Sequence, residues 1–143
     1  MIQKTNNMIE KEIGYFDVIY SLLKHPYNVN SLIKLVFLSL AINNTFDIST
    51  LCNRKQNLAK ELLSNLLNIS NNFECEMASV LNIIDKLRKS DTIKINGDKI
   101  ELVKNIEFQS FSSFINSKNS LEIIKSVTNL SMESFMGEVL KYV

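Results

Sequence analysis

The stretch from Ser79 to Leu102 constrains the fold most, because the spacing of its apolar residues changes once along its length. Up to Leu87 the apolar residues recur every three or four positions, as they do on one face of a helix. From Ile93 onward they alternate with polar residues, as in strands, and Asn96-Gly97 interrupts the alternation. An Asn-Gly pair favours the positive φ values of a two-residue hairpin turn. The sequence therefore predicts a helix that leads into a tight β-hairpin turning at residues 96–98.

Helical spacing also appears in the first part of the chain. A helix is predicted from about Glu10 to Lys24. It ends at His25-Pro26, because a proline disfavours the helical conformation of the residue before it. Its apolar stripe consists of Ile9, Ile13, Phe16, Tyr20 and Leu23. A second helix runs to about Asn43-Asn44, with Asn30 or Ser31 as a possible cap. It is apolar on nearly every side, which places it at the centre of a bundle or under a partner.

Three more helical segments are predicted before the hairpin: a short turn over 47–51, a longer helix over 53–69 and the helix over 73–89. The break between the last two lies at residues 70–72, Ser-Asn-Asn. In the longer helix the apolar positions face inward and the basic ones are solvated. The inward positions are Leu58, Leu62, Leu66 and Ile69, and the solvated ones are Arg54, Lys55 and Lys60.

The region after the hairpin again has helical spacing. A short amphipathic segment carries Phe108, Phe111, Phe114 and Ile115, and two further helices are capped by Ser120 and Ser131. The fold class is therefore mainly α: a small helical domain with one β-hairpin, similar to a winged helix, and C-terminal helices. We predict a single domain over 1–143, with the winged-helix-like part over 10–104 and a C-terminal helical extension over 105–143.

Composition and charge narrow the class of protein. Hydrophobic residues make up 45% of the chain, which is typical of a folded domain with a real core. The acidic N-terminal region does not resemble a secretory signal, and the longest apolar run, 32–42, is about half of what spans a membrane. Cys52 and Cys75 are isolated, as reduced thiols are. We expect a soluble, cytoplasmic protein that does not bind membranes.

The residues needed for catalysis are scarce. His25 is the only histidine and lies beside a proline, where a surface turn explains it better than general-base chemistry. One His and two distant Cys do not give the spacing of a zinc site, and three scattered glycines do not form a phosphate-binding loop. We expect no enzyme activity, no cofactor and no metal.

Basic residues gather around the end of the hairpin helix and on the hairpin. Flexible cations beside a docking helix are suited to phosphate contacts. Acidic residues lie among them, and a net charge of +1 is low for a dedicated nucleic-acid binder. The alternatives are a weak DNA contact and a structural or protein-binding hairpin. The candidate DNA contacts are Lys86, Arg88, Lys89, Lys94 and Lys99.

Met, Phe and aliphatic residues form a stripe along one face of the last predicted helix. Core packing explains such a stripe, and so does docking of the helix into a partner, because Met and Phe suit adaptable protein surfaces. The candidate docking residues are Met132, Phe135, Met136, Val139 and Leu140.

Two segments, 25–43 and 79–102, resemble the middle components of bacterial ABC-three-component systems and the small subunits of Lamassu-type anti-phage systems. The positions that carry the resemblance are Leu32, Lys34, Phe37 and Leu38, followed by Ile84, Leu87, Ile93, Gly97, Asp98, Ile100 and Leu102. A departure occurs at Asp91-Thr92, where the family pattern more often has glycine or another small residue.

The resemblance implies a non-enzymatic adaptor subunit. Such a subunit would link an SMC- or Rad50-like ABC ATPase to an effector, often a nuclease, in anti-phage defence. Two alternatives remain open from the residues alone: a stand-alone winged-helix DNA-binding transcriptional regulator, and an unrelated helical interaction protein.

Overall fold

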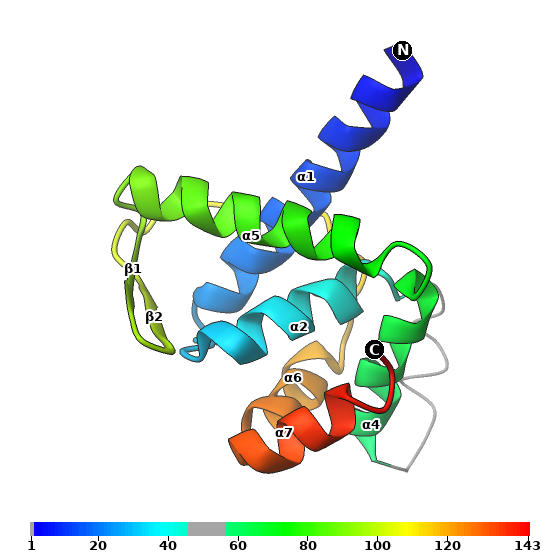
Figure 1. Ribbon diagram of the computed structural model, residues 1–143. Coiled ribbons are helices and arrows are strands. Elements are labelled where there is room, and N and C mark those ends of the chain that lie inside the picture. Colours follow the sequence, from blue (N-terminus) through cyan, green and yellow to red (C-terminus); the bar gives the residue numbers. More distant parts are fainter. Residues whose placement is uncertain (1, 46–56) are drawn as a thin grey trace.

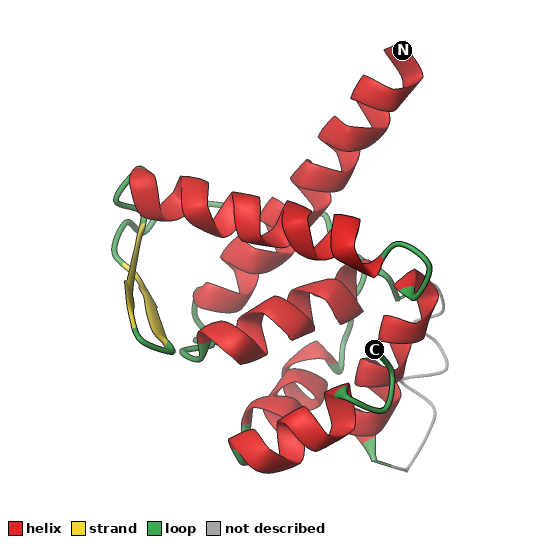
Figure 2. Ribbon diagram, viewed as in Figure 1, coloured by secondary structure: helices red, strands yellow, loops and turns green. Residues whose placement is uncertain are grey.

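The computed structural model describes residues 2–45 and 57–143 and is mainly helical, with one antiparallel hairpin (Figures 1 and 2). This confirms the predicted fold class. In chain order the elements are α1 (Ile2–Leu23), α2 (Leu32–Asn43), α4 (Leu58–Leu63), the 3-10 helix η1 (Ser64–Ile69), α5 (Phe73–Lys89), β1 (Ile93–Asn96), β2 (Lys99–Leu102), α6 (Ser120–Thr128) and α7 (Met132–Val139).

Helix α2 lies at the centre of the molecule, as its apolar sequence predicts. It packs against α1, α4, η1 and α5, and most of its residues from Leu35 to Ile42 are buried. Its single charged residue, Lys34, reaches the C-terminal end of α6, where its Nζ donates to the carbonyls of Thr128 and Leu130. The helix is therefore covered mainly by its own chain, and one hydrophobic core includes side chains from Tyr15 to Val139.

Helix α5 and the hairpin match the prediction closely. Val80, Ile83, Ile84 and Leu87 are buried on one side of α5. Ile93 and Ile100 are buried on the side of the hairpin that joins this core. Between helix and hairpin, Asp91 has a φ of +58°. Glycine adopts this left-handed conformation most readily, and Asp tolerates it.

The turn of the hairpin is shifted by one residue from the prediction. Asn96 pairs with Lys99, so the two turn residues are Gly97 and Asp98 rather than Asn96 and Gly97. Gly97 has a φ of +62°, and Asn96 is not among the residues with positive φ. Glycine at the first turn position is the signature of a type II′ turn, which also suits a twisted hairpin.

The hairpin tip lies beside the N-terminal end of α2 (Figure 1), and Asp98 at this tip caps the helix. Its carboxylate accepts hydrogen bonds from the Ser31 hydroxyl at 2.7 Å and the Ile33 amide at 2.9 Å. Its carbonyl accepts from the Leu32 amide at 2.7 Å. Ser31 itself is the N-cap residue and accepts from the Lys34 amide, as one of the two predicted caps. Asp98 thus fixes the hairpin to the central helix.

Replacing Asp98 with alanine should lower the free energy of unfolding by about 1–2 kcal/mol, the usual cost of losing a helix cap. An Asp98→Asn variant keeps one oxygen acceptor and should lose less than half as much. Urea unfolding of both variants measures the difference. Glu101→Ala, an exposed change on the same hairpin, serves as the control. Equal stability of Asp98→Ala and Glu101→Ala would refute the capping role.

The segment 104–119 is not helical, which corrects the prediction of an amphipathic helix around Phe108, Phe111, Phe114 and Ile115. It lies along α1 as a loop with turns, and side chains of α1 bind its backbone. The Tyr20 hydroxyl lies within 3.2 Å of the carbonyls of Lys104 and Ile106, and Asp17 accepts from the Phe111 amide at 2.8 Å. These contacts replace the hydrogen bonds that a helix would make. We call residues 104–119 the strap.

The remaining helices differ in their ends. Asn119, not Ser120, precedes α6, and the buried Ser120 hydroxyl instead contacts the Tyr27 hydroxyl. Ser131 caps α7 as predicted, accepting from the Ser134 amide. The predicted helix over 53–69 is described only from Leu58, where α4 begins after its cap Asn57, and its second half is the 3-10 helix η1.

The other predictions for this region have mixed outcomes. Leu62, Leu66 and Ile69 are buried and Leu58 is half-buried, which confirms the inward face. The predicted turn over 47–51, Cys52, Arg54 and Lys55 lie outside the described residues. Among the helices of the described ranges, none is both long enough and apolar enough to cross a membrane.

Candidate functional site

The five basic candidates lie at the C-terminal end of α5 and on the hairpin, and all are exposed. Three of them pair with carboxylates of the same chain. Asp85 contacts Arg88 at 2.7 Å and Lys89 at 2.9 Å, while Lys86 lies 3.7 Å from Glu12 of α1. The hydrogen bonds from Lys89 and Arg88 hold the pKa of Asp85 below its usual value. The acid therefore stays charged and offsets its two basic neighbours.

Lys94 and Lys99 lie on the polar face of the hairpin. Lys94 stands opposite Glu101, and Lys99 stands opposite Asn96. A carboxylate directly across the ladder reduces the attraction of Lys94 for phosphate. The basic end of α5 and the hairpin therefore present mixed charge rather than a continuous positive surface.

The predicted docking stripe of α7 is divided between core and surface. Phe135 and Val139 are fully buried, and the Phe135 ring meets that of Phe37 edge-on at a centroid distance of 6.2 Å. Met136 is half-buried, whereas Met132 and Leu140 are 36% and 66% exposed. Core packing thus explains Phe135 and Val139, and Met132, Met136 and Leu140 remain accessible to a partner.

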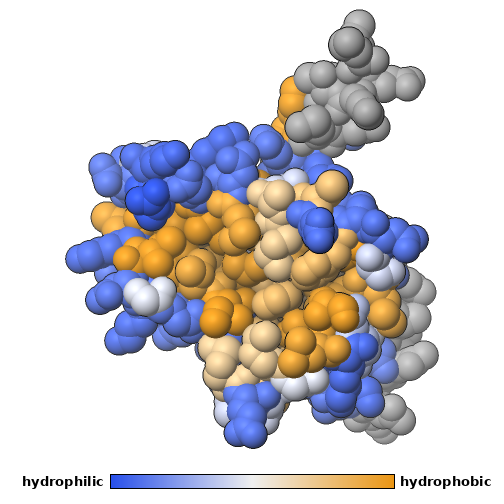
Figure 3. All heavy atoms as spheres, in the orientation of Figure 1, coloured by the Kyte–Doolittle hydropathy of each residue, from blue (hydrophilic) through white to orange (hydrophobic). Residues whose placement is uncertain are grey.

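An apolar surface is gathered over α2, between α5, the hairpin and α7 (Figure 3). Hydrophilic residues border it on α5 and on the hairpin. We call it the α2-side surface. The exposed or half-buried apolar side chains of the helices around it include Ile33 and Phe37 of α2, Met77 and Leu81 of α5, and Met132 and Met136 of α7.

A second apolar surface is the groove between α1 and α5, with a volume of about 470 Å³. Ile9, Ile13 and Phe16 line it from α1 and are 50%, 60% and 37% exposed. The sequence placed these three residues on the same stripe as Tyr20 and Leu23, but only the latter two are buried. The N-terminal part of α1 projects past α5, so no other helix of the described ranges packs on the apolar stripe there (Figure 1).

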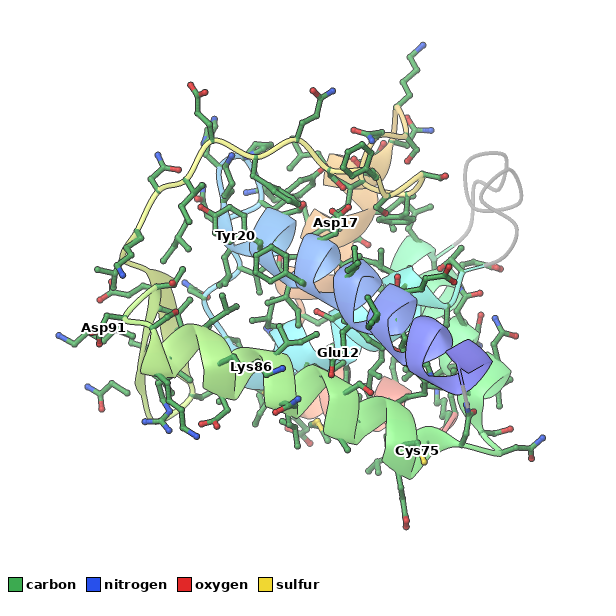
Figure 4. All side chains as sticks on the ribbon, turned by 90° about the horizontal axis from the view of Figure 1, so that it is seen from above. Glu12, Asp17, Tyr20, Cys75, Lys86 and Asp91 are labelled. Carbon is green, nitrogen blue, oxygen red and sulfur yellow. The ribbon has the colours of Figure 1, made fainter. Side chains whose placement is uncertain are left out.

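The α1–α5 groove has an apolar floor and a charged rim. Ile83 and Leu87 of α5 form the floor, and each is less than 10% exposed. Glu12 and Lys86 form part of the rim, and Figure 4 shows both side chains between the two helices. An apolar floor between charged rims is the pattern that an amphipathic helix of a partner fits.

The two surfaces use different sides of α5. At roughly 100° per residue, Ile83 of the groove lies about 160° around the helix from Leu81 of the α2-side surface. A ligand on one surface therefore leaves the other open. Sequence reasoning missed Ile33 and Leu81. Leu81 lies at the edge of the buried stripe of α5, about 60° around the helix from Ile84.

A buried polar cluster joins α1, α2 and the start of α5. Glu76 is 4% exposed, and its carboxylate accepts from the Tyr15 hydroxyl at 2.5 Å and pairs with Lys11 at 2.6 Å. Asn72 donates to the same carboxylate, and Asn44 donates to the Tyr15 hydroxyl. Burial and the bond to Glu76 raise the pKa of Tyr15. Each polar atom has a partner, which indicates a structural role.

Other residues considered for chemistry are dispersed. His25 is exposed in the α1–α2 connection, and Cys75 is exposed in the first turn of α5. No three His, Cys, Asp or Glu side chains gather as metal ligands would within residues 2–45 and 57–143. Comparison of the chain with models of protein families, with curated proteins and with solved structures finds no match.

Proposed function

We propose that this chain is a non-enzymatic adaptor subunit that links two proteins in the cytoplasm. The observation that supports it is the pair of apolar surfaces on different sides of α5, the α2-side surface and the α1–α5 groove. An adaptor needs two separate docking surfaces, and exposed apolar patches with polar rims are typical of protein-binding sites. Following the resemblance, the partners are an SMC- or Rad50-like ABC ATPase and an effector of an anti-phage system.

The charge distribution favours an adaptor over a DNA-binding regulator. Affinity for DNA grows with the number of phosphates that a protein neutralises. Lys86, Arg88 and Lys89 already face Glu12 or Asp85, so few cations are left for phosphates. Within a larger complex, Lys94 and Lys99 would add a weak contact to DNA that another subunit holds.

Single charges placed on each surface should separate the two interactions. We expect Leu81→Glu and Ile13→Glu each to weaken binding of one partner at least tenfold, because burying an unpaired charge in an apolar contact costs more than about 1.4 kcal/mol. Each variant should leave the other partner bound. The measurement is co-expression with an ABC ATPase and an effector encoded beside this chain, followed by gel filtration and titration.

The matched control is Leu121→Glu, because Leu121 is 39% exposed on α6, which contributes to neither surface. It should leave both interactions unchanged. A monodisperse monomer that binds neither partner would contradict the adaptor function. Submicromolar, sequence-specific binding of the purified chain to DNA at physiological salt would instead support the regulator.

A further inference from the structure

The outer edge of β2 carries backbone groups that point away from the hairpin. In an antiparallel pair, hydrogen-bonded and non-hydrogen-bonded residue pairs alternate along the ladder. The Val103 amide donates to the Thr92 carbonyl, so 92 and 103 form a bonded pair and Ile93 and Leu102 form the next, non-bonded pair. Ile95 and Ile100 are non-bonded for the same reason. The amides and carbonyls of Ile100 and Leu102 therefore face outward.

A third strand begins along this edge and stops after two residues. Ser31 forms an antiparallel bridge with Lys99, and the Ile100 amide donates to the Asn30 carbonyl at 3.1 Å. The chain then leaves β2, because Asn28 has a φ of +48° and the Val29 amide bonds back to Leu22 of α1. Within the described ranges, the Leu102 amide and the Ile100 and Leu102 carbonyls have no hydrogen-bond partner.

A cavity of about 550 Å³ lies where the third strand would continue. The α1–α2 connection borders it on one side and β2 on the other. Leu23, Val29, Ile100 and Leu102 supply its apolar lining. Lys24, Glu101 and Asn105 supply polar groups. The cavity therefore combines outward backbone groups with an apolar wall, which is the combination that receives an added strand.

We propose that an extended peptide segment of a partner protein binds in this cavity, antiparallel to β2, and completes the interrupted strand. The occupant follows from the register. It must offer a backbone carbonyl to the Leu102 amide and an amide to the Leu102 carbonyl, which an extended backbone does and a helix, with its backbone groups bonded internally, does not. Because side chains of a strand alternate, every second one faces the apolar wall. This site is separate from the two surfaces of the proposed adaptor and does not depend on them.

The test uses phage-displayed random nonapeptides selected on the whole chain. Selected peptides should carry β-branched or aromatic residues at alternating positions. Leu102→Pro removes the outward amide and leaves the bonds between β1 and β2, so it should weaken binding at least tenfold. The matched control is Ile95→Pro, which removes an outward amide on the opposite edge of the same hairpin and should leave binding unchanged. Circular dichroism checks that both variants remain folded.

A second measurement avoids any change to the chain. Synthetic copies of a selected peptide, each N-methylated at one amide, should lose binding at alternate positions only. The Leu102 amide should exchange slowly with solvent in the complex and rapidly without peptide. Selection of peptides with helical spacing, equal binding to Leu102→Pro, or no enrichment over background would overturn the proposal. Equal loss at every methylated position would overturn it as well.

Discussion

Replacing Phe135 with alanine should lower the free energy of unfolding by about 3–5 kcal/mol, the usual cost of deleting a fully buried aromatic ring. Phe135 is completely buried in α7, and its ring contacts Phe37 of the central helix. The deletion leaves a cavity between α7 and α2 as well as removing apolar area from the core. Chemical unfolding with urea, followed by circular dichroism, measures the change.

Met132→Ala in the same helix is the matched control. Met132 is 36% exposed, so its removal should cost less than about 1 kcal/mol, as for most surface changes. The difference in unfolding free energy between Phe135→Ala and Met132→Ala shows which residues of the α7 stripe belong to the core and which are free for docking. A loss below about 1 kcal/mol for Phe135→Ala would mean that α7 is not packed on the core as described.

Replacing Glu76 with alanine should lower the free energy of unfolding by about 3 kcal/mol, because it leaves the buried Tyr15 hydroxyl without an acceptor and breaks an ion pair. The expected cost is at the lower end for a buried pair, since the Lys11 side chain is 38% exposed and regains water. Glu76→Gln keeps one acceptor oxygen and should cost less than the alanine change. Urea unfolding of each variant measures the order.

Glu74→Ala is the control, because Glu74 is exposed and lies in the same first turn of α5. Both acids interact with the helix dipole, so the difference between the two variants isolates the buried cluster. The raised pKa of Tyr15 gives a second signature. The protonated Tyr15 contributes its full stabilisation of the folded state below pH 10, the ordinary pKa of tyrosine, and this stabilisation is lost as the pH rises above that value. Tyr15→Phe should remove that loss. A similar cost for Glu74→Ala and Glu76→Ala would contradict a special role of the cluster.

Local patterns predicted α5 and the hairpin well, because both depend on local periodicity. The alternation of Ile93, Ile95, Ile100 and Leu102 identified the strands and their buried side. The turn was misplaced by one residue, because Gly97 suits the second position of a turn over residues 96–97 as well as the first position of the turn found over 97–98. Asp98 explains the choice, since the observed turn brings it to the start of α2.

The strap could not be predicted from local patterns. Phe108, Phe111, Phe114 and Ile115 have helical spacing, but their environment is set by α1 at a distance of more than 80 residues along the chain. Phe114 is buried and Phe111 is 90% exposed, which no helical face would produce. The exposed part of the α1 stripe was missed for a related reason. Spacing defines a face but not how far along the helix the rest of the chain covers it.

The candidate sites were predicted in part. The spacing of Asp85 to Arg88 and Lys89, three and four residues, already indicates that the acid neutralises its neighbours on one helix face. The pairing of Lys86 with Glu12 depends on how α1 crosses α5 and has no local signal. The two docking surfaces depend on the same crossing. For the α2-side surface, the sequence indicates Met132 and Met136 as docking candidates and the apolar helix that contains Phe37 as one that a partner could cover.

The strap has a consequence for how the chain is made. Asp17 and Tyr20 of α1, with Lys24 and Tyr27 in the connection after it, bind backbone groups of residues 104–115, so this end of the helix has polar partners more than 80 residues farther along the chain. A growing chain on the ribosome presents its N-terminal part first. Helix α1 therefore leaves the ribosome well before the strap is synthesised, and its C-terminal end completes its packing only after residues 104–115 have emerged.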